Sequence, residues 1–334
     1  MRNGGLIWLT APALGACSQV QSALSPEGDK AQAVAGLFWL FTAVCAAVWL
    51  IVIAIMVVAV LRGRPWEAAP DVEPDRRREH RVGIVVTSGT AITVVILIVL
   101  TFASFLTNMG FAGAPDLALT IRISGHQWWW QINYEAHDPS RRFETANELH
   151  IPVGQEVRLQ FESPDVIHSF WVPNLAGKQD LIPGRLTQLT LMADKPGVYR
   201  GQCAEYCGAQ HAHMVFYVVV QRPQAFAHWF NAQIGSAHPP QTDEQRRGQM
   251  IFMARACATC HTIGGTNAGG IVGPDLTHFG SRMTIAAGTL WNKQPLLEQW
   301  IAAPQKIKPY TRMPSADLDR GELHEVAKYL ESLK

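Results

Sequence analysis

The stretch GQCAEYCGAQHAHM, residues 201–214, brings two thiols, an imidazole and a thioether together in one short segment. Its candidate donor side chains are Cys203, Cys207, His211 and Met214. Copper favours soft sulfur with imidazole, whereas magnesium and calcium do not. Zinc is the main alternative, but structural zinc usually takes its thiols as paired Cys-x-x-Cys knuckles, and no second knuckle serves this pair. A disulfide between the two cysteines would leave the other two donors without a shared role, so we predict a soft-metal site.

Another candidate donor, His168, lies upstream in the run SPDVIHSFWVP. This run, KQDLIPGR at residues 178–185 and the 201–214 stretch together resemble subunit II of the haem-copper cytochrome c oxidases. The resemblance implies a dinuclear copper centre, CuA. Its ligands would be the bridging thiolates of Cys203 and Cys207, the imidazoles of His168 and His211, the thioether of Met214 and the backbone carbonyl of Glu205. It also implies that the Glu205 side chain holds magnesium at the border with subunit I, and that His213 is a neighbour rather than a ligand.

The chemistry of such a centre indicates electron transfer rather than substrate binding. Two thiolates shared between two coppers spread one electron over both metals, so that little bond rearrangement accompanies each transfer. Weak donors such as a thioether and a carbonyl tune the reduction potential. We therefore predict that this loop is an electron relay.

The region around the loop, from Pro115 onward, alternates β-branched and aromatic residues with polar ones, and glycine and proline interrupt the alternation. The clearest segments are LALTIRISGHQWWWQINY (117–134), ELHIPVGQEVRLQFES (148–163), RLTQLTLMADKPGVYRGQC (185–203) and MVFYVVVQ (214–221). Strands of period two at this spacing predict an all-β sandwich, and the resemblance implies that it is a cupredoxin domain. A stiff sandwich suits a metal whose geometry must change little when an electron arrives.

Three consecutive tryptophans, residues 128–130, lie in one predicted half-buried strand. Alternation should leave at least one indole facing outward, and exposed aromatic side chains commonly mark docking surfaces. The resemblance implies that electrons enter through Trp128, below a docked cytochrome c. The alternative is that all three indoles pack in the core or against subunit I, and we expect this of one or two of them. His126 is expected to be structural.

Two uncharged apolar runs, at about 33–61 and 83–106, exceed the roughly 20 residues that span a hydrocarbon core, so we predict two transmembrane helices. The segment between them is rich in arginine, whereas residues 107–119 contain no Lys or Arg. The positive-inside rule therefore places this loop in the cytoplasm and both chain ends outside. Cys45, inside the first run, is expected to be an inert apolar residue.

Glu79 lies at the cytoplasmic mouth of the second run, where the oxidase family has a glutamate at the entrance of a proton path into subunit I. A plain surface position explains this residue equally well. The aromatic and proline residues that follow the glutamate in many relatives are absent here, where Val82 and Val86 stand instead.

The N-terminus has the features of an export signal, because Arg2 precedes the mostly apolar stretch LIWLTAPALGAC. Residues 14–17 resemble the bacterial lipoprotein cleavage box, in which the cysteine, here Cys17, is lipidated and becomes the new N-terminus. An uncleaved leader with a chance cysteine is the alternative. Residues 18–30 are polar and are expected to form a tether outside the membrane.

The C-terminal region contains CATCH, residues 257–261, a signature for covalent attachment of haem c through Cys257 and Cys260 with His261 as an iron ligand. A thioredoxin-like use of the pair is disfavoured because no βαβ pattern surrounds it. The module resembles class I cytochrome c, with GPDL after the signature and Met313 in IKPYTRMPS as the second axial ligand. Met283 is the alternative axial ligand, and His/Met ligation would raise the haem potential.

These patterns divide the chain into five parts. We predict a signal peptide (1–17), a two-helix membrane domain (18–112), a CuA cupredoxin domain (113–225), a linker (226–240) and an all-α cytochrome c domain (241–334). A net charge of +1 indicates no polyanionic partner, so nucleic acid is not expected. Six cysteines are too few and too clustered for a disulfide framework.

The resemblance, over nearly all of the chain, implies subunit II of a caa-type cytochrome c oxidase. Electrons would come from cytochrome c or an upstream respiratory complex. They would pass through haem c and CuA to subunit I, whose haem a and CuB reduce oxygen while protons are pumped, in a complex that also contains subunit III. The expected location is the bacterial inner membrane, with the copper and haem domains outside.

Three other electron-transfer proteins and one binding protein are alternatives to this function. An accessory subunit of a nitric oxide reductase would also carry CuA. A nitrous oxide reductase fragment is disfavoured by the paired helices, and a quinol oxidase subunit by the intact copper ligands. A membrane-tethered copper-binding module would have no use for a fused haem domain or for Glu205.

Overall fold

The computed structural model describes residues 21–63, 76–109 and 119–334. The chain divides into two compact units, one holding Met1–Ala31 with Leu117–Lys334 and the other Gln32–Asp116. The predicted signal peptide, with the lipidation candidate Cys17, lies outside the described residues.

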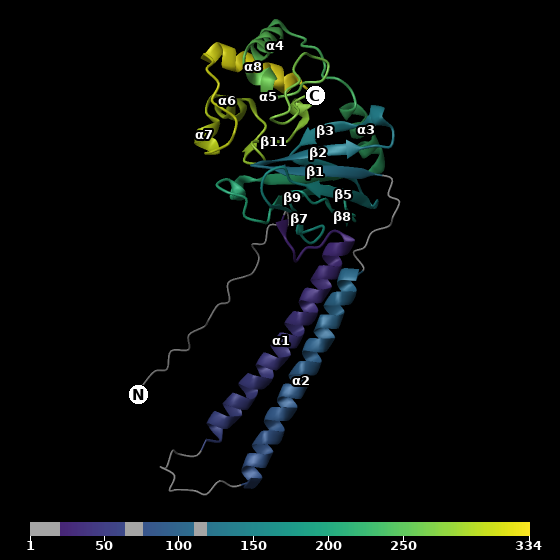
Figure 1. Cartoon of the computed structure of the whole chain (residues 1–334), viewed down its shortest axis with the longest axis vertical. Coiled ribbons are helices and arrows are strands. Elements are labelled where there is room, and N and C mark those ends of the chain that lie inside the picture. Colours follow the sequence, from purple (N-terminus) through teal and green to yellow (C-terminus); the bar gives the residue numbers. More distant parts are fainter. Residues whose placement is uncertain (1–20, 64–75, 110–118) are drawn as a thin grey trace, which may run out of the picture. The chain divides into compact units, whose positions relative to one another are not determined.

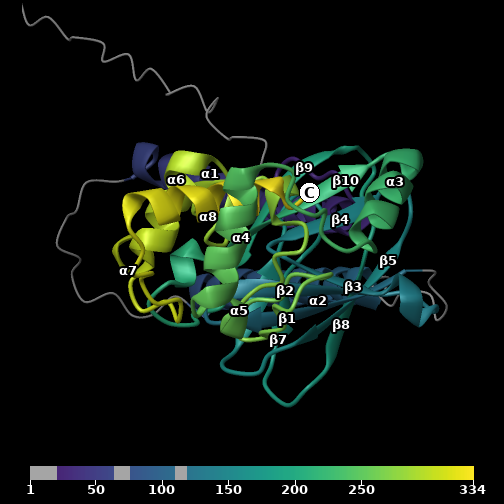
Figure 2. The same cartoon turned by 90° about the horizontal axis from the view of Figure 1, so that it is seen from above.

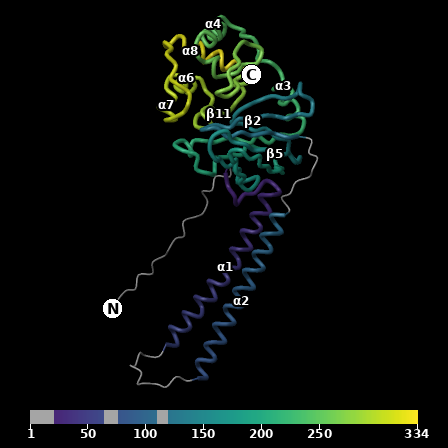
Figure 3. The backbone as a smooth tube through the Cα atoms, in the orientation of Figure 1, coloured from purple at the N-terminus to yellow at the C-terminus, as the bar shows by residue number. Residues whose placement is uncertain are grey.

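The smaller unit consists of two long helices, which Figure 3 shows as uninterrupted coils. They are α1 Asp29–Leu61 and α2 Arg76–Met109, and both are long and apolar enough to cross a membrane. Both are longer than the predicted spans, because each begins in polar residues before its apolar run. Cys45 is a free cysteine within α1, and Glu79 is exposed in the first turn of α2.

The larger unit begins with a β-sandwich, as predicted. One sheet has the order β3-β2-β1-β5-β8 and the other β4-β10-β9-β6-β7. Their bounds are β1 Thr120–His126, β2 Trp129–Glu135, β3 Phe143–Ala146, β4 Glu148–Pro152, β5 Val157–Glu162, β6 His168–Trp171, β7 Gln179–Leu181, β8 Thr187–Leu191, β9 Gly197–Cys203 and β10 Val215–Gln221. Each sheet contains one parallel pairing, β1 with β5 and β4 with β10, so both sheets are mixed.

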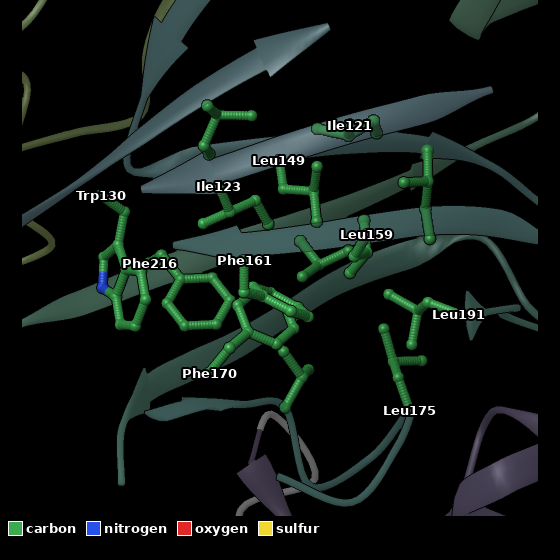
Figure 4. Close-up of a cluster of buried hydrophobic side chains, with 14 of the residues drawn as sticks. Ile121, Ile123, Trp130, Leu149, Leu159, Phe161, Phe170, Leu175, Leu191 and Phe216 are labelled. Atoms are coloured by element: carbon green, nitrogen blue, oxygen red, sulfur yellow. The ribbon is translucent and has the colours of Figure 1, made fainter. Parts of the chain in front are cut away.

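The sandwich core is formed by alternate residues of these strands, shown in Figure 4. Burial alternates along β2 and β5, as the period of two requires. Phe170 and Phe216 stack with ring centroids 4.4 Å apart, and Trp130 meets Phe216 edge-on at 5.1 Å. A Cβ on Gly201 would lie 2.2 Å from the Phe216 ring, so glycine is needed there. Each buried aromatic side chain contributes about 1.5–3 kcal/mol of stability.

A short helix, α3 Pro223–Gln233, follows the last strand and closes one end of the sandwich. Phe226, Trp229 and Phe230 pack against the sandwich core, and Trp229 stacks on His150 at 3.9 Å. The segment predicted as a linker therefore begins with a helix that belongs to the β-domain. Its aromatic residues recur at the i, i+3, i+4 spacing that gives a helix one apolar face.

The C-terminal domain is built around α4 and α8, which pack closely together. Its elements are α4 Asp243–Ala254, α5 Cys257–Cys260, β11 Thr284–Ile285, β12 Leu290–Trp291, α6 Gln294–Ala302, α7 Pro304–Ile307 and α8 Arg320–Ser332. Capping boxes at Thr242 and Asp319 start the two main helices. Figures 1 and 2 show this helical domain beside the part of the sandwich that contains β1, β2 and β3.

The segment before α1 pairs with the sandwich by backbone and side-chain hydrogen bonds. The Ser22 amide donates to Asn174 Oδ1 at 3.0 Å, and the Glu27 amide donates to the Asn174 carbonyl at 2.7 Å. The Glu27 carboxylate also pairs with Lys195 at 2.8 Å. Residues 22–27, predicted as part of a tether, are thus attached to the β-domain.

Candidate copper centre and haem cavity

Three elements bring the predicted copper ligands together. Cys203 ends β9, and His168 begins the neighbouring strand β6. The antiparallel pairing of Phe170 with Cys203 places the His168 side chain beside the sulfur. The loop after β9 supplies the other ligands and ends at Met214, whose carbonyl accepts a hydrogen bond from the Cys203 amide at 3.0 Å.

The donor atoms lie within one small cluster. The two Sγ atoms of Cys203 and Cys207 are 3.7 Å apart, and both cysteines are free, which removes the disulfide alternative. Cys203 Sγ lies 3.9 Å from His168 Nδ1 and 3.2 Å from the Glu205 carbonyl. Cys207 Sγ lies 3.7 Å from His211 Nδ1 and 3.9 Å from Met214 Sδ. This donor set of thiols, imidazoles, thioether and carbonyl fits copper.

The cluster is shielded from water, which favours tight metal binding and fast electron transfer. Both cysteines are 2% exposed, and His168 and Met214 are fully buried. The hydrogen bond that Cys203 shares with Cys207 lowers the pKa of the Cys203 thiol. A thiolate, which is the form that binds metal, therefore develops readily at this position.

Asp165 orients the His168 ring, a role that the motif did not reveal. Its Oδ1 lies 2.8 Å from His168 Nε2, so Nδ1 faces the sulfur. Burial opposes ionisation of Asp165, but hydrogen bonds from His168 and from the Val166 and Gln127 amides lower its pKa to about 2. A carboxylate behind a ligating imidazole fixes the ring and raises its basicity. The only sequence signal was its position three residues before the histidine.

Two side chains near the cluster point away from it. His213 Nδ1 bonds to Gln210 Oε1 at 2.8 Å, consistent with its predicted place as a neighbour. The Glu205 carboxylate lies 3.9 Å from Lys178 Nζ, and both side chains are exposed. Its carbonyl and its carboxylate therefore face different surroundings, as the two predicted roles of this residue require.

A cavity of about 400 Å³ is lined mostly by the C-terminal domain and on one side by residues 126–129 of the β-domain. All four predicted haem-binding residues line it, namely Cys257, Cys260, His261 and Met313. Met283 is absent from the described lining, and its amide instead donates to Glu148 Oε2 at 2.9 Å. A cavity of this size with convergent polar groups suits a cofactor, and the geometry favours Met313 over Met283.

His261 is oriented as an iron ligand would be. Its Nδ1 donates to the Pro274 carbonyl at 2.8 Å, which leaves the Nε2 lone pair available to a metal. Burial lowers the pKa of His261, so the neutral, ligating form is favoured. A Cβ on Gly273 would lie 2.5 Å from the ring, which explains the glycine of the GPDL motif.

Arg282 also lines the cavity, although its sequence context gave no signal. Its side chain is buried, and its Nε has no hydrogen-bond partner among the described residues. An unpaired guanidinium N–H in a cavity fits the carboxylate of a bound haem. The cavity is thus large enough for a cofactor, its two cysteines suit covalent attachment of haem, and Arg282 suits the charge of a haem carboxylate.

Trp128 connects the two sites. Its indole Nε1 donates to the carbonyl of Cys207 at 3.0 Å, and its side chain lines the cavity that contains Cys257 and Cys260. It is only 8% exposed, and residues of the chain's own C-terminal domain line the cavity beside it. The indole expected below an external dock is therefore already covered, and the partly exposed indole is Trp129, which stacks on His126 at 4.6 Å.

Known proteins match both domains of this larger unit. The family described as cytochrome C oxidase subunit II, periplasmic domain, matches residues 119–222, and the cytochrome c family matches residues 245–334. Cytochrome c oxidase subunit 2 of Alkalihalophilus pseudofirmus is 33% identical over 320 residues, covering 94% of this chain and 91% of that protein. The chain belongs to the cytochrome c oxidase subunit II family. The predicted family and fold class are thereby confirmed.

Other members of the family give shorter matches. Cytochrome c oxidase subunit 2 of Bacillus sp. strain PS3 is 28% identical and covers 76% of this chain and 75% of its own length. The periplasmic domain of subunit II from Bradyrhizobium japonicum is 34% identical over 36% of this chain and 96% of that chain, with a TM-score of 0.34. The two matched domain families imply copper and haem as cofactors.

Proposed function

We propose that this chain is subunit II of a caa-type cytochrome c oxidase and relays electrons through two of its own centres to subunit I. The observation that carries the proposal is the position of Trp128. This indole bonds to the copper loop through Cys207 and lines the haem cavity. A direct connection between the two sites is what a relay within one chain requires.

The proposed copper centre is dinuclear CuA, with a role for six residues of the family motif. The residues that would hold the copper are Cys203 and Cys207 through thiolates, His168 and His211 through imidazole, Met214 through its thioether and Glu205 through its carbonyl. The second group is haem c, attached through Cys257 and Cys260 and held by His261 and Met313. When bound, these groups supply two centres that each take up and release one electron.

The protein's contribution is to fix these groups and keep water away. Hydrogen bonds fix both imidazole rings, that of His168 to Asp165 and that of His261 to the Pro274 carbonyl. Neither ring therefore needs to turn when the charge of a bound metal changes. Trp130 donates to the Met214 carbonyl at 3.4 Å and packs beneath the loop. A rigid, dry surrounding keeps the reorganisation that accompanies each transfer small.

The two apolar helices and the family of the β-domain support a location in the bacterial inner membrane with both redox domains on the outer side. Subunit I with haem a and CuB would be the acceptor, and subunit III a further partner. The external donor would be a cytochrome c or an upstream complex. The Glu205 side chain with magnesium, the Glu79 proton path and lipidation at Cys17 remain proposals from the family motif.

The alternatives have less support. The family match over nearly the whole chain is to an oxidase subunit, which favours the oxidase over a nitric oxide reductase. A membrane-tethered copper-binding module would not require the cavity in the C-terminal domain that Met313 and His261 line. Copper storage also needs no indole between a metal loop and a second site.

The test is spectroscopy on the purified oxidase that contains this subunit. We expect a covalent haem c spectrum, and an electron paramagnetic resonance signal of one unpaired electron shared by two copper nuclei. Cys203→Ser should abolish oxidation of cytochrome c by the complex and leave haem c reducible. A hyperfine pattern from a single copper would falsify the dinuclear assignment, and a copurifying subunit with the iron centre of a nitric oxide reductase would overturn the oxidase assignment.

A further inference from the structure

A buried lysine, Lys308, lies between the haem cavity and the copper loop. It follows α7 in the C-terminal domain, it is 1% exposed, and it lines the cavity. Its Nζ donates to the Trp128 carbonyl at 2.8 Å, the His213 carbonyl at 3.0 Å and the Ala286 carbonyl at 3.3 Å. One side chain therefore binds three segments that are far apart in the sequence.

The three contacts suit the charged form of the side chain. An ammonium group has three N–H donors and no acceptor, and three carbonyls face Nζ. A neutral amine would bring one lone pair that no donor meets. Burial lowers the pKa of Lys308 to about 7, and a negative charge on the Cys207 sulfur acts in the opposite sense. An apolar residue of similar length would avoid this desolvation, so the lysine does more than fill space.

The acceptors belong to both domains. Trp128 and His213 lie in the β-domain, next to the electron path and the thioether ligand, whereas Ala286 lies in the C-terminal domain. Two more hydrogen bonds join the domains around this point. The Val215 amide donates to the Ala287 carbonyl at 3.1 Å, and the Met283 amide donates to Glu148 Oε2 at 2.9 Å.

We propose that Lys308 is a positioning residue that holds the cytochrome domain against the copper domain in the one arrangement competent for internal electron transfer. It stands five residues before Met313 and binds the residue before Met214. It therefore couples the segment of a haem ligand to the loop of a copper ligand. Lys308 would thereby hold the residues of the two sites in place while one electron leaves a haem held by His261 and Met313 and the same electron reaches copper held by the loop. This inference rests on the proposed function.

The test compares Lys308→Met with Lys306→Met in the purified oxidase. Both changes remove one positive charge from the same segment, but Lys306 is exposed. The first readout is hydrogen–deuterium exchange at the amides of Val215 and Met283, which needs no turnover. We expect Lys308→Met to speed exchange at both amides by at least about tenfold, since hydrogen bonds from a charged group are lost, and Lys306→Met to leave it unchanged.

The second readout is the rate of internal electron transfer after the haem is reduced by a light flash with a ruthenium complex. Lys308→Met should slow this step by at least about tenfold while the haem and copper spectra stay those of the wild type, because a small misplacement of the partners costs a large factor in rate. An unchanged rate or unchanged amide exchange would overturn the proposal. Wild-type protein lacking haem or copper would overturn the proposed function instead.

Lys308→Gln is the second variant, because it keeps two N–H donors and loses the charge. We expect a rate between those of the wild type and Lys308→Met. Failure of both Lys308 variants to yield a subunit that carries haem and copper would contradict the proposal, because it would show that the lysine is needed for folding rather than for positioning.

Discussion

At the scale of single residues, the proposed copper ligands depend on neighbours that the motif does not contain. Asp165 bonds to the ring of His168 at 2.8 Å, and its carboxylate stays ionised because hydrogen bonds lower its pKa to about 2. Removing this charge leaves the ligand in place but frees its orientation. The effect should therefore appear in metal affinity before it appears in folding.

We predict that Asp165→Asn lowers copper affinity by about 10–100-fold, the usual cost of losing a carboxylate behind a ligating imidazole. Titration of the purified oxidase with a copper chelator measures this change. Glu162→Gln is the control, because Glu162 is a carboxylate on the neighbouring strand β5 that bonds to Ser124 at 2.8 Å rather than to a ligand. Equal copper retention in the two variants would contradict the orienting role of Asp165.

The two candidate methionines of the haem domain allow a matched comparison. Met313 lines the cavity, whereas the Met283 amide is bonded to Glu148 in the β-domain. We predict that Met313→Ala lowers the reduction potential of the haem and opens an iron coordination position to added ligands, because the thioether raises the potential. Met283→Ala should leave the haem spectrum and potential unchanged. The reverse pattern in a redox titration would assign Met283 as the ligand.

At the scale of elements, the loop after α5 must approach the His261 ring closely. A Cβ on Gly273 would lie 2.5 Å from the ring, whereas a Cβ on Gly269 would meet nothing within 4 Å. We predict that Gly273→Ala destabilises the domain by about 1–3 kcal/mol and perturbs the haem spectrum, because the ring must shift. Gly269→Ala is the control. Thermal unfolding followed through haem absorbance compares them, and similar curves for both variants would contradict this packing argument.

Much of the fold followed from local sequence patterns. The period of two in LALTIRISGHQWWWQINY predicts the strands β1 and β2, and the length of each apolar run predicts α1 and α2. The copper donors were identifiable because most lie within fourteen residues, 201–214, and the haem residues because CATCH is a contiguous motif. Local spacing carries such information directly.

Contacts between distant segments could not be predicted in this way. Lys308 and Trp128 are 180 residues apart in the sequence. No rule of residue spacing predicts that these two residues lie in contact. The aromatic face of α3 was present in the sequence, but its partner surface on the sandwich was not. The contact of Trp128 with Lys308 of the C-terminal domain likewise depends on how two folded surfaces fit together.

At the scale of the whole molecule, fusing the cytochrome to the copper domain replaces a diffusional encounter by a built contact. The surface around Trp128 is covered within the chain, so an external cytochrome would have to deliver its electron to the haem domain rather than to the copper loop. A fixed contact and a transient one respond differently to salt, because screening acts on exposed charges and much less on buried ones.

We predict that internal electron transfer changes less than about twofold when ionic strength rises from about 0.01 M to about 1 M, although the Debye length falls from about 30 Å to about 3 Å. The reason is that the contact uses buried hydrogen bonds, including those of Lys308, rather than exposed ion pairs. Flash reduction of the haem at each salt concentration measures the rate. Reduction of the same haem by an added charged cytochrome is the internal comparison and should depend on salt. A steep fall of the internal rate would instead mean that the domains dock and separate in each cycle.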